Sequence, residues 1–166
     1  CVTVPYGQYA QAALDVDSPI NLARCDAVLL ALDERGLPWA PGLFDPTGGD
    51  TSASAALDAL FALRDALVAH GGARVVLQTI PAPAERLFGD LDRLVPGAQR
   101  RRVEQFNQGL IRHLDPANDI LFDVAALAET VGLSRWRSAA QWNLAKLPFA
   151  AAALPLYADA LCRRLA

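Results

Sequence analysis

The sequence predicts an α/β fold in which helices cover both faces of an open parallel sheet, giving three layers. Two observations support this prediction. Short runs that are apolar on both faces alternate along the chain with longer segments of helical periodicity, and such an alternation favours parallel strands joined by right-handed crossovers. At 166 residues and 53% hydrophobic composition, the chain has enough apolar material for the core of one domain. We therefore expect a single domain over residues 1–166.

Four short apolar runs are expected to form the strands of this sheet. Parallel strands that are buried on both faces read as continuous apolar runs rather than as an alternation of apolar and polar residues. The runs are Val2–Pro5, Ala27–Leu32, Arg74–Gln78 and Ile120–Asp123.

Three longer segments have the spacing of apolar residues that is typical of amphipathic helices. They are Ser52–Ala69, Gln99–His113 and Ala150–Leu165. Pro155 must lie in the first turn of the third helix or kink it, because proline cannot donate a helical hydrogen bond. The proline-containing stretches 37–51 and 81–97 are expected to be long loops.

Composition argues against several classes of function. A net charge of −3 and a pI near 5.3 disfavour non-specific nucleic-acid binding, which needs a basic surface. No apolar run approaches the roughly 20 residues of a membrane span, so neither a nucleic acid nor a membrane is an expected partner. Cys1, Cys25 and Cys162 are scattered and odd in number, which fits a reducing cytoplasm and suggests neither a disulfide framework nor a metal site.

The start of the chain suggests a piece of a longer protein. There is no methionine, and the sequence opens directly on the apolar run "CVTVPYG". We therefore expect the fold to be incomplete at its N-terminus.

The candidate site lies at the carboxyl ends of the strands, where open parallel sheets bind ligands. Each of the four runs ends in polar residues or is followed by them there, among them Gln8, Glu34, Gln78 and Asp123. We expect Gln8, Gln78 and Asp123 to line a polar crevice. The alternative is that these polar residues only terminate the strands.

Asn107 is a further candidate, at the edge of the apolar stripe of the second helix. A buried amide without partners would cost roughly 1–3 kcal/mol. Its side chain is therefore expected either to face a ligand or to bond a neighbouring loop.

Both histidines are expected far from this crevice. His70 and His113 lie at the carboxyl ends of helices that lead into strands, which places them at the opposite edge of the sheet. A cation at that position interacts favourably with the helix dipole. The segment therefore lacks a base for a serine–histidine triad, and its two separated imidazoles do not form a metal site. We expect no catalytic residue and no cofactor in it.

The basic triplet Arg100–Arg102 opens the second helix, where positive charge is mildly unfavourable. It is expected to be a solvated surface or a docking patch for an acidic carrier protein.

Four segments in order resemble the N-terminal, SGNH-hydrolase-like domain of FkbH-like proteins. They are "VPYGQYAQAALDVDSPI", "CDAVLLAL", "LQTIPAPAERLFGDLDRLVPGAQRRRVEQFNQGLIRHL" and "ILFDVAALAETVGLSRWRSAAQWNLAKLPFAAAALPLYADAL". The resemblance covers nearly the whole chain and implies a flavodoxin-like arrangement of the sheet. In that family the domain precedes a phosphatase-type domain of the haloacid dehalogenase superfamily, for which Mg²⁺ is expected.

The same resemblance implies a role in polyketide-type biosynthesis. Some FkbH-like proteins load a glyceryl unit from a phosphorylated glycerate onto an acyl carrier protein and release phosphate. The chain departs from the family in two respects. The phosphatase motif Asp-x-Asp-x-Thr is absent, and "RWRSAAQWNLAK" has no histidine where an active SGNH hydrolase has one.

Trp142 and Lys146 occupy this histidine-free stretch, and Lys146 is the only lysine beside fourteen arginines. A short helix from about Ser138 to Lys146 would place both side chains on one face. Lys146 is then expected to offer a charge to a phosphate or carboxylate while Trp142 covers an apolar patch. The alternative is that Trp142 fills the core and Lys146 is only a solvent-exposed cation at a helix end.

Three functions are compatible with these patterns. The first is an accessory domain of an FkbH-like enzyme, which holds substrate or acyl carrier protein beside its phosphatase-type domain and is not catalytic by itself. The second is an SGNH-type esterase or acyltransferase whose nucleophile lies outside this segment. The third is a structural dimerisation module without a ligand.

Overall fold

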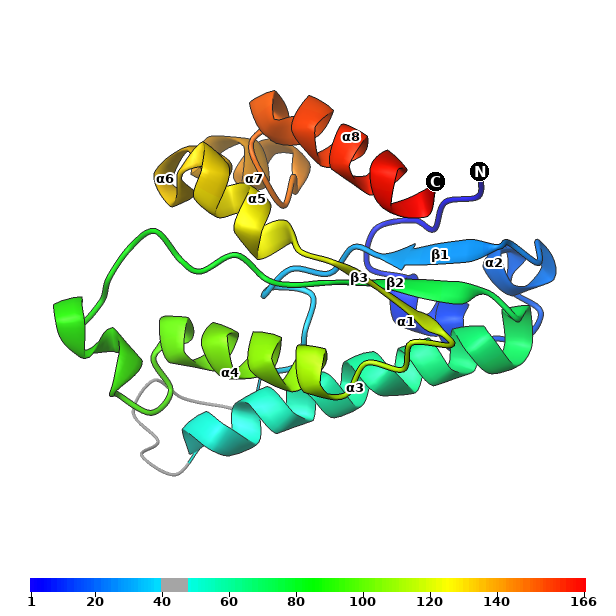
Figure 1. Ribbon diagram of the computed structural model, residues 1–166, viewed down its shortest axis with the longest axis horizontal. Coiled ribbons are helices and arrows are strands. Elements are labelled where there is room, and N and C mark those ends of the chain that lie inside the picture. The colour runs from blue at the N-terminus through cyan, green and yellow to red at the C-terminus, as the bar shows by residue number, and fades with distance from the viewer. Residues whose placement is uncertain (40–47) are drawn as a thin grey trace.

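The computed structural model describes residues 1–39 and 48–166. Its sheet has three parallel strands in the order β1 (Ala27–Leu30), β2 (Arg74–Gln78) and β3 (Asp119–Phe122). In the register, Ala27 lies opposite Arg74, and Val75 lies opposite Asp119. The predicted α/β fold with an open parallel sheet is confirmed (Figure 1).

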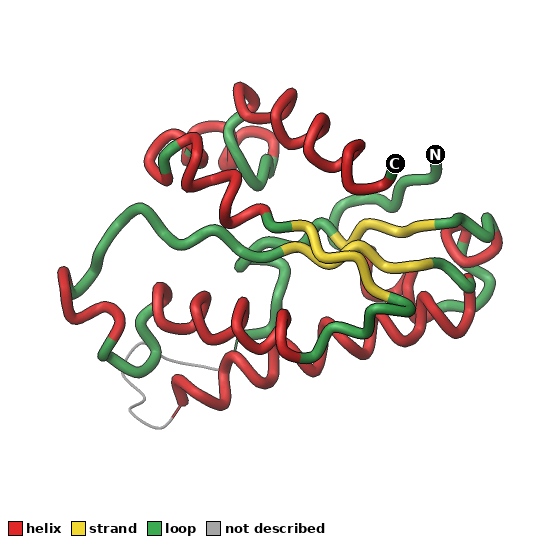
Figure 2. The backbone as a smooth tube through the Cα atoms, in the orientation of Figure 1, coloured by secondary structure: helices red, strands yellow, loops and turns green. Residues whose placement is uncertain are grey.

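Helices cover both faces of this sheet. The α-helices are α1 (Tyr9–Leu14), α2 (Pro19–Leu22), α3 (Gly48–Gly71), α4 (Gln99–Arg112), α5 (Val124–Val131), α6 (Leu133–Trp136), α7 (Ala139–Ala145) and α8 (Leu154–Leu165), with 3-10 turns η1 (Gly89–Arg93) and η2 (Ala151–Ala153). The crossover helices α3 and α4 pack together on one face, and α5 and α8 lie on the other (Figures 1 and 2). Two successive right-handed crossovers in the same direction place their helices on one face, which accounts for the pairing of α3 with α4.

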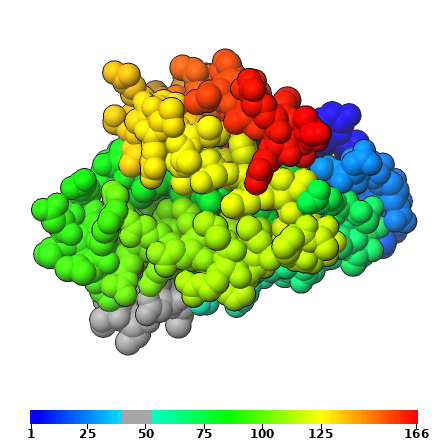
Figure 3. All heavy atoms as spheres, viewed as in Figure 1, coloured from blue at the N-terminus to red at the C-terminus, as the bar shows by residue number. Residues whose placement is uncertain are grey.

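The central strand β2 contributes to two separate cores. Val75 and Leu77 belong to the core formed with α1, α3 and α4, and Val76 belongs to the core formed with α5 and α8. These three side chains are at most 1% exposed. Because successive side chains of a strand point to opposite faces, a sheet covered on both sides needs apolar residues at every position. The atoms of α5–α8 form a continuous band along one side of the molecule (Figure 3).

The prediction that Val2–Pro5 forms a strand is wrong. This segment has no secondary structure, and all of it except the half-buried Val4 is exposed. It leads through a turn at Gly7, whose φ is +80°, into the short helix α1, which the sequence analysis did not predict. A four-residue apolar run carries too little periodicity to identify a strand, and its proline cannot donate to a ladder.

The other predicted elements are confirmed with shifted ends. β1 ends at Leu30 and β3 begins at Asp119, while α3 runs from Gly48 to Gly71. Pro155 lies in the first turn of α8, as its chemistry requires. The predicted loop 37–51 falls largely outside the described residues. Within the described part of the chain, no helix is both long enough and apolar enough to cross a membrane.

Candidate functional site

One arginine joins three segments at the carboxyl edge of the sheet. Arg137, between α6 and α7, donates to both carboxylate oxygens of Glu34 in the loop after β1, and Nη2 lies 2.9 Å from Oε2. The same nitrogen donates to the carbonyl oxygen of Pro81 in the loop after β2, also at 2.9 Å. The side chain of Glu34 is only 7% exposed. A bidentate contact of this kind fixes geometry as well as neutralising the carboxylate.

A pocket of about 220 Å³ lies beside this ion pair. Its lining residues come from the loop after β1 and from the start of α4, and they are Glu34, Arg35, Trp39, Gln99, Arg102 and Val103. The indole N–H of Trp39 donates to the carbonyl oxygen of Glu34, and its ring meets the ring of Phe106 edge-on at 5.7 Å. Trp39 is thereby held as a fixed wall of the pocket.

Among the described residues, two arginines and one glutamate line the pocket, so its lining is net positive. The guanidinium carbon of Arg102 lies 5.7 Å from the centre of the Trp39 ring, and its Nε is buried without a hydrogen-bond partner among the described residues. Burial lowers the pKa of Arg102 because it disfavours the charged form. Arg35 forms a long ion pair of 3.8 Å with Asp33. Since Arg137 neutralises Glu34, the pocket favours an anion.

Trp142 and Lys146 lie beside this pocket, because Arg35, which lines it, also contacts the Trp142 ring. The guanidinium carbon of Arg35 is 4.0 Å from the centre of the Trp142 ring, and Nζ of Lys146 is 5.4 Å from it. Trp142 is half-buried and belongs to neither core, so it does not fill the interior. Lys146 is exposed and ends α7 in the left-handed conformation, with φ 55°.

Gln78 is held on both sides by protein groups. Its Nε2 donates to the carbonyl oxygen of Leu32 at 3.0 Å, and its Oε1 accepts from the Tyr157 hydroxyl at 2.8 Å. Gln78 is 9% exposed, and both ends of its amide are used. The side chain therefore links the loop after β1 to α8.

Asp123 caps a helix at the same edge. It accepts a hydrogen bond from the backbone N–H of Ala126 at 3.3 Å and another from the Thr79 hydroxyl at 2.8 Å. Thr79 in turn accepts from the backbone N–H of Ala125 at 2.9 Å. This network sets the start of α5 against the end of β2.

Of the two expectations for Asn107, the structure shows the hydrogen bond to a neighbouring loop and not a side chain that faces a ligand. Its Oδ1 accepts from the backbone N–H of Ile80, and its Nδ2 donates to the carbonyl oxygen of Ile80, both at 2.8 Å. Ile80 is 1% exposed, so no solvent replaces these partners.

We expect Asn107→Ala to lower the free energy of unfolding by about 2–4 kcal/mol, since two buried backbone groups lose their partners. Urea denaturation would measure the loss. Gln108→Ala, an exposed amide on the next residue of the same helix, is the control and should stay within about 0.5 kcal/mol of the parent. An equal effect of both changes would contradict the proposed pairing.

Gln8 lies apart from these contacts. It is exposed at the start of α1 and its side chain does not cap that helix. The next residue, Tyr9, donates its hydroxyl to the carbonyl oxygen of Gly36 in the loop after β1. The structure therefore brings together Gln78, Asp123 and Asn107 around the ends of β2 and β3, and Trp142 and Lys146 around the loop after β1.

The two histidines lie at the amino edge of the sheet, as predicted. His70 is in the last turn of α3, ahead of β2, and His113 follows α4, ahead of β3. The Nδ1 of His113 is 2.9 Å from the carbonyl oxygen of Gly109. Among residues 1–39 and 48–166 there is no group of three or more His, Cys, Asp or Glu side chains that would hold a metal ion.

The pocket itself is not predicted by the sequence. Arg35, Trp39 and Arg137 were not singled out, and Arg102 was treated only as part of the basic triplet. Glu34 and Arg137 are 103 residues apart in the chain, so no local pattern joins them. The one available signal was the acidic pair after β1, which lies at the edge where ligands bind in this class of fold.

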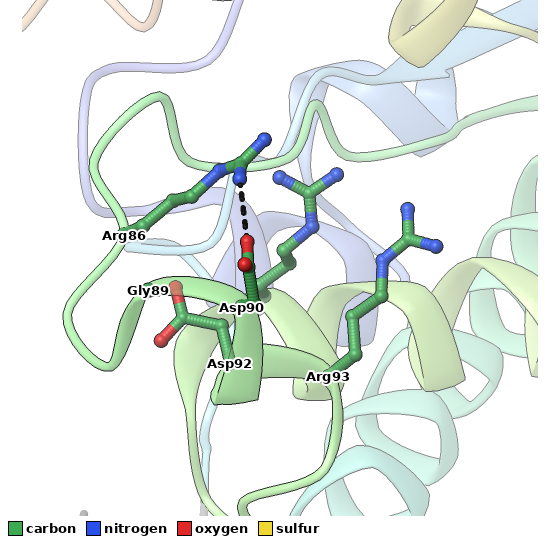
Figure 4. A pocket seen from close by; sticks show the side chains of 6 residues that line it. Arg86, Gly89, Asp90, Asp92 and Arg93 are labelled. Carbon is green, nitrogen blue, oxygen red and sulfur yellow. Dashed lines mark hydrogen bonds and ion pairs between the residues drawn. The ribbon is translucent and has the colours of Figure 1, made fainter.

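A second pocket of about 190 Å³ lies around η1, with Arg86, Asp90, Asp92 and Arg93 among its residues (Figure 4). The guanidinium groups of Arg86 and Arg93 point to the same side of the turn. Each is already paired: Arg86 lies 3.2 Å from Asp90, and Arg93 lies 3.1 Å from Glu104. The positive charge of these two arginines is therefore compensated.

The burial of the Tyr157 hydroxyl predicts a change of stability at high pH. Burial raises the pKa of Tyr157 from 10.0 to about 12, because the ionised phenolate would lie in the core. The folded chain therefore holds this proton more tightly than the unfolded chain. The stabilisation is complete below pH 10 and is lost as the pH rises toward 12, by about 2–3 kcal/mol. Tyr157→Phe should remove this part of the pH dependence, measured by urea denaturation between pH 9 and pH 12.

The fold and the edge contacts define an α/β domain with an open parallel sheet and a small, positively charged pocket at the carboxyl edge. Over 96% of its length the chain is similar to a chain in the crystal structure of the N-terminal part of the protein BF1531 from Bacteroides fragilis, which contains a phosphatase domain complexed with Mg. The TM-score is 0.75, the sequence identity is 16%, and the match covers 42% of that chain. The present chain thus has the fold of one part of a chain that contains a phosphatase domain.

Sequence comparison finds a different likeness. The chain is 35% identical over 97 residues to the acetyl-coenzyme A carboxylase carboxyl transferase subunit beta of Clostridium botulinum strains Hall and Okra. This match covers 52% of the chain and 34% of those relatives, so the chain spans about a third of their length. No family model matches the sequence.

Proposed function

We propose that the chain is the accessory N-terminal domain of an FkbH-like enzyme and presents an acyl carrier protein or its substrate to a phosphatase-type domain of the same protein. The observation that supports this most is the fold match over 96% of the chain to part of a protein that contains a phosphatase domain. The four segments that resemble FkbH-like proteins lead to the same class from the sequence. In this proposal Mg²⁺ belongs to the phosphatase-type domain.

The carboxyl edge offers suitable chemistry for this task. Acyl carrier proteins are acidic, and Arg35, Trp142 and Lys146 present two cations on an aromatic ring beside the pocket. Cations at an interface speed the association with a negatively charged partner and help to orient it. The bound carrier would deliver its acyl group to the neighbouring domain, where the phosphate is released.

The backbone of Lys146 supports a role for its side chain. A non-glycine residue in the left-handed region is uncommon and carries a conformational cost, and glycine or asparagine is usual at such a helix end. Here the chain keeps its only lysine at that position. Lys146→Gly should therefore raise the stability slightly while it removes the ammonium group.

The proposal is tested by titrating the ¹⁵N-labelled chain with an acyl carrier protein. We expect saturable shifts of the Trp142 indole resonance, and at least a fivefold weaker affinity for Lys146→Gly at unchanged or higher melting temperature. Arg163→Gln, an exposed arginine near the end of α8, is the control and should bind like the parent. Equal affinity of Lys146→Gly and the parent, or no binding at all, would contradict the proposal.

A further inference from the structure

We propose that the pocket between the loop after β1 and the start of α4 binds a small ligand through its phosphate group, which Arg35 and Arg102 hold against Trp39. The choice of a phosphate rests on the proposed function, in which a phosphorylated substrate or the phosphodiester of a carrier-bound arm meets this edge. The lining residues used below all belong to the described part of the chain.

The charge of the pocket favours a phosphate. Arg102 is the unusual residue, because its Nε is buried and makes no hydrogen bond within the described part of the chain. Burying such a donor without a partner is unfavourable, and burial also lowers the pKa of the guanidinium. A phosphate oxygen at this position would satisfy the donor and compensate the charge at once.

The helix that carries Arg102 also favours an anion at its N-terminus. α4 has 14 residues, its first turn contains no acidic side chain, and no side chain caps it at Ala98. Positive side chains at a helix N-terminus oppose the helix dipole, whereas a bound anion is stabilised by it. An anion between Arg35 and Arg102 would therefore relieve an arrangement that is unfavourable in the free chain.

The neighbouring carboxylate of Glu34 does not compete with a bound phosphate for these arginines. Glu34 lines the pocket, but Arg137 already donates to both of its carboxylate oxygens. Trp39 adds a flat apolar wall that is fixed by its bond to the Glu34 carbonyl. A phosphate thus meets two guanidinium groups, and the lining carboxylate of Glu34 is already paired with Arg137.

Size limits the ligand. Pockets for drug-sized molecules measure about 300–1,000 Å³, and this one measures about 220 Å³. It accommodates a phosphate with a few attached carbons and is too small for a dinucleotide. The pocket around η1 has a similar volume of about 190 Å³, but Arg86 and Arg93 there are already paired with carboxylates.

The test is a titration of the chain with glycerol 3-phosphate, followed through the indole resonance of Trp39 at constant ionic strength. Dimethyl phosphate, as a diester, and acetate are titrated in parallel. We expect saturable binding of the phosphate probes, with acetate weaker. The monoester binding more tightly would indicate a free phosphorylated substrate, and the diester binding at least as tightly would indicate a carrier-bound arm.

Variants identify the site. Arg102→Gln should weaken the binding at least tenfold, and Arg86→Gln, from the other pocket, should stay within twofold of the parent. Arg102→Lys keeps the charge and the aliphatic stem, so its affinity for the phosphate probes should lie between those of the parent and Arg102→Gln. It replaces Arg102→Gln as the test if the glutamine variant does not fold. Binding that does not saturate, or that is equal in the parent and both Arg102 variants, would overturn the inference. Phosphate binding without carrier binding would contradict only the proposed function, and carrier binding without phosphate binding would contradict only this inference.

Discussion

Arg137→Met is expected to lower the free energy of unfolding by about 3–5 kcal/mol, because it leaves the buried Glu34 carboxylate without its partner. The Glu34 side chain is 7% exposed and receives both guanidinium contacts from Arg137. The change also removes the donor to the Pro81 carbonyl. Three connecting segments at the carboxyl edge would lose the group that joins them.

A double variant distinguishes the loss of the ion-pair attraction from the cost of leaving a buried carboxylate unpaired. Glu34→Gln combined with Arg137→Met removes both charges, so it should be more stable than Arg137→Met alone. Urea denaturation at pH 7 measures all the variants. Arg135→Met, an exposed arginine two residues earlier, is the control and should stay within about 0.5 kcal/mol of the parent. A loss below about 1 kcal/mol for Arg137→Met would show that the carboxylate reaches water instead.

The sequence predicted the elements of this fold better than their contacts. β2 was recognised because every one of its residues after Arg74 is buried, so the apolar run is continuous. The run Val2–Pro5 is about as apolar as β3, yet it does not pair with the sheet. A short apolar run becomes a strand only if an adjacent strand offers unpaired backbone N–H and C=O groups. The presence of such a strand is a tertiary property.

The candidate site shows the same division. The polar residues after the strands do gather at one edge, as the topology of parallel sheets requires. Their partners lie far away in the chain: Asn107 bonds Ile80 at a separation of 27 residues, and Tyr157 bonds Gln78 at 79. Trp39 and Arg102 become a pocket only when the loop after β1 meets the start of α4. The spacing of residues in the sequence carries no information on such tertiary contacts.

The second large effect is expected at Trp136, the bulky aromatic residue next to Arg137. Trp136 is 2% exposed and packs on Phe149 at 5.1 Å between ring centres. Phe149 stacks on Tyr157 at 4.7 Å, and Tyr157 meets Phe122 of β3 edge-on at 5.0 Å. This row of rings joins α6 and α8 to the sheet, and it forms much of the smaller of the two cores.

Trp136→Ala should therefore lower the free energy of unfolding by about 3–5 kcal/mol, through lost burial and the cavity left behind. Trp136→Phe keeps an aromatic ring in place and should cost clearly less. Urea denaturation gives the magnitude, and amide hydrogen exchange should show faster opening in α5–α8 than in α3 and α4.

The effects at Trp136 and Arg137 are also expected to be coupled. Both residues hold the turn between α6 and α7, so loosening Trp136 already weakens the geometry that Arg137 needs to reach Glu34. Trp136→Ala combined with Arg137→Met should then cost less than the sum of the single changes, by about 1 kcal/mol or more. Strict additivity would mean that the aromatic row and the ion pair stabilise the edge independently. The pocket beside Glu34 would in that case depend on Arg137 alone for its shape.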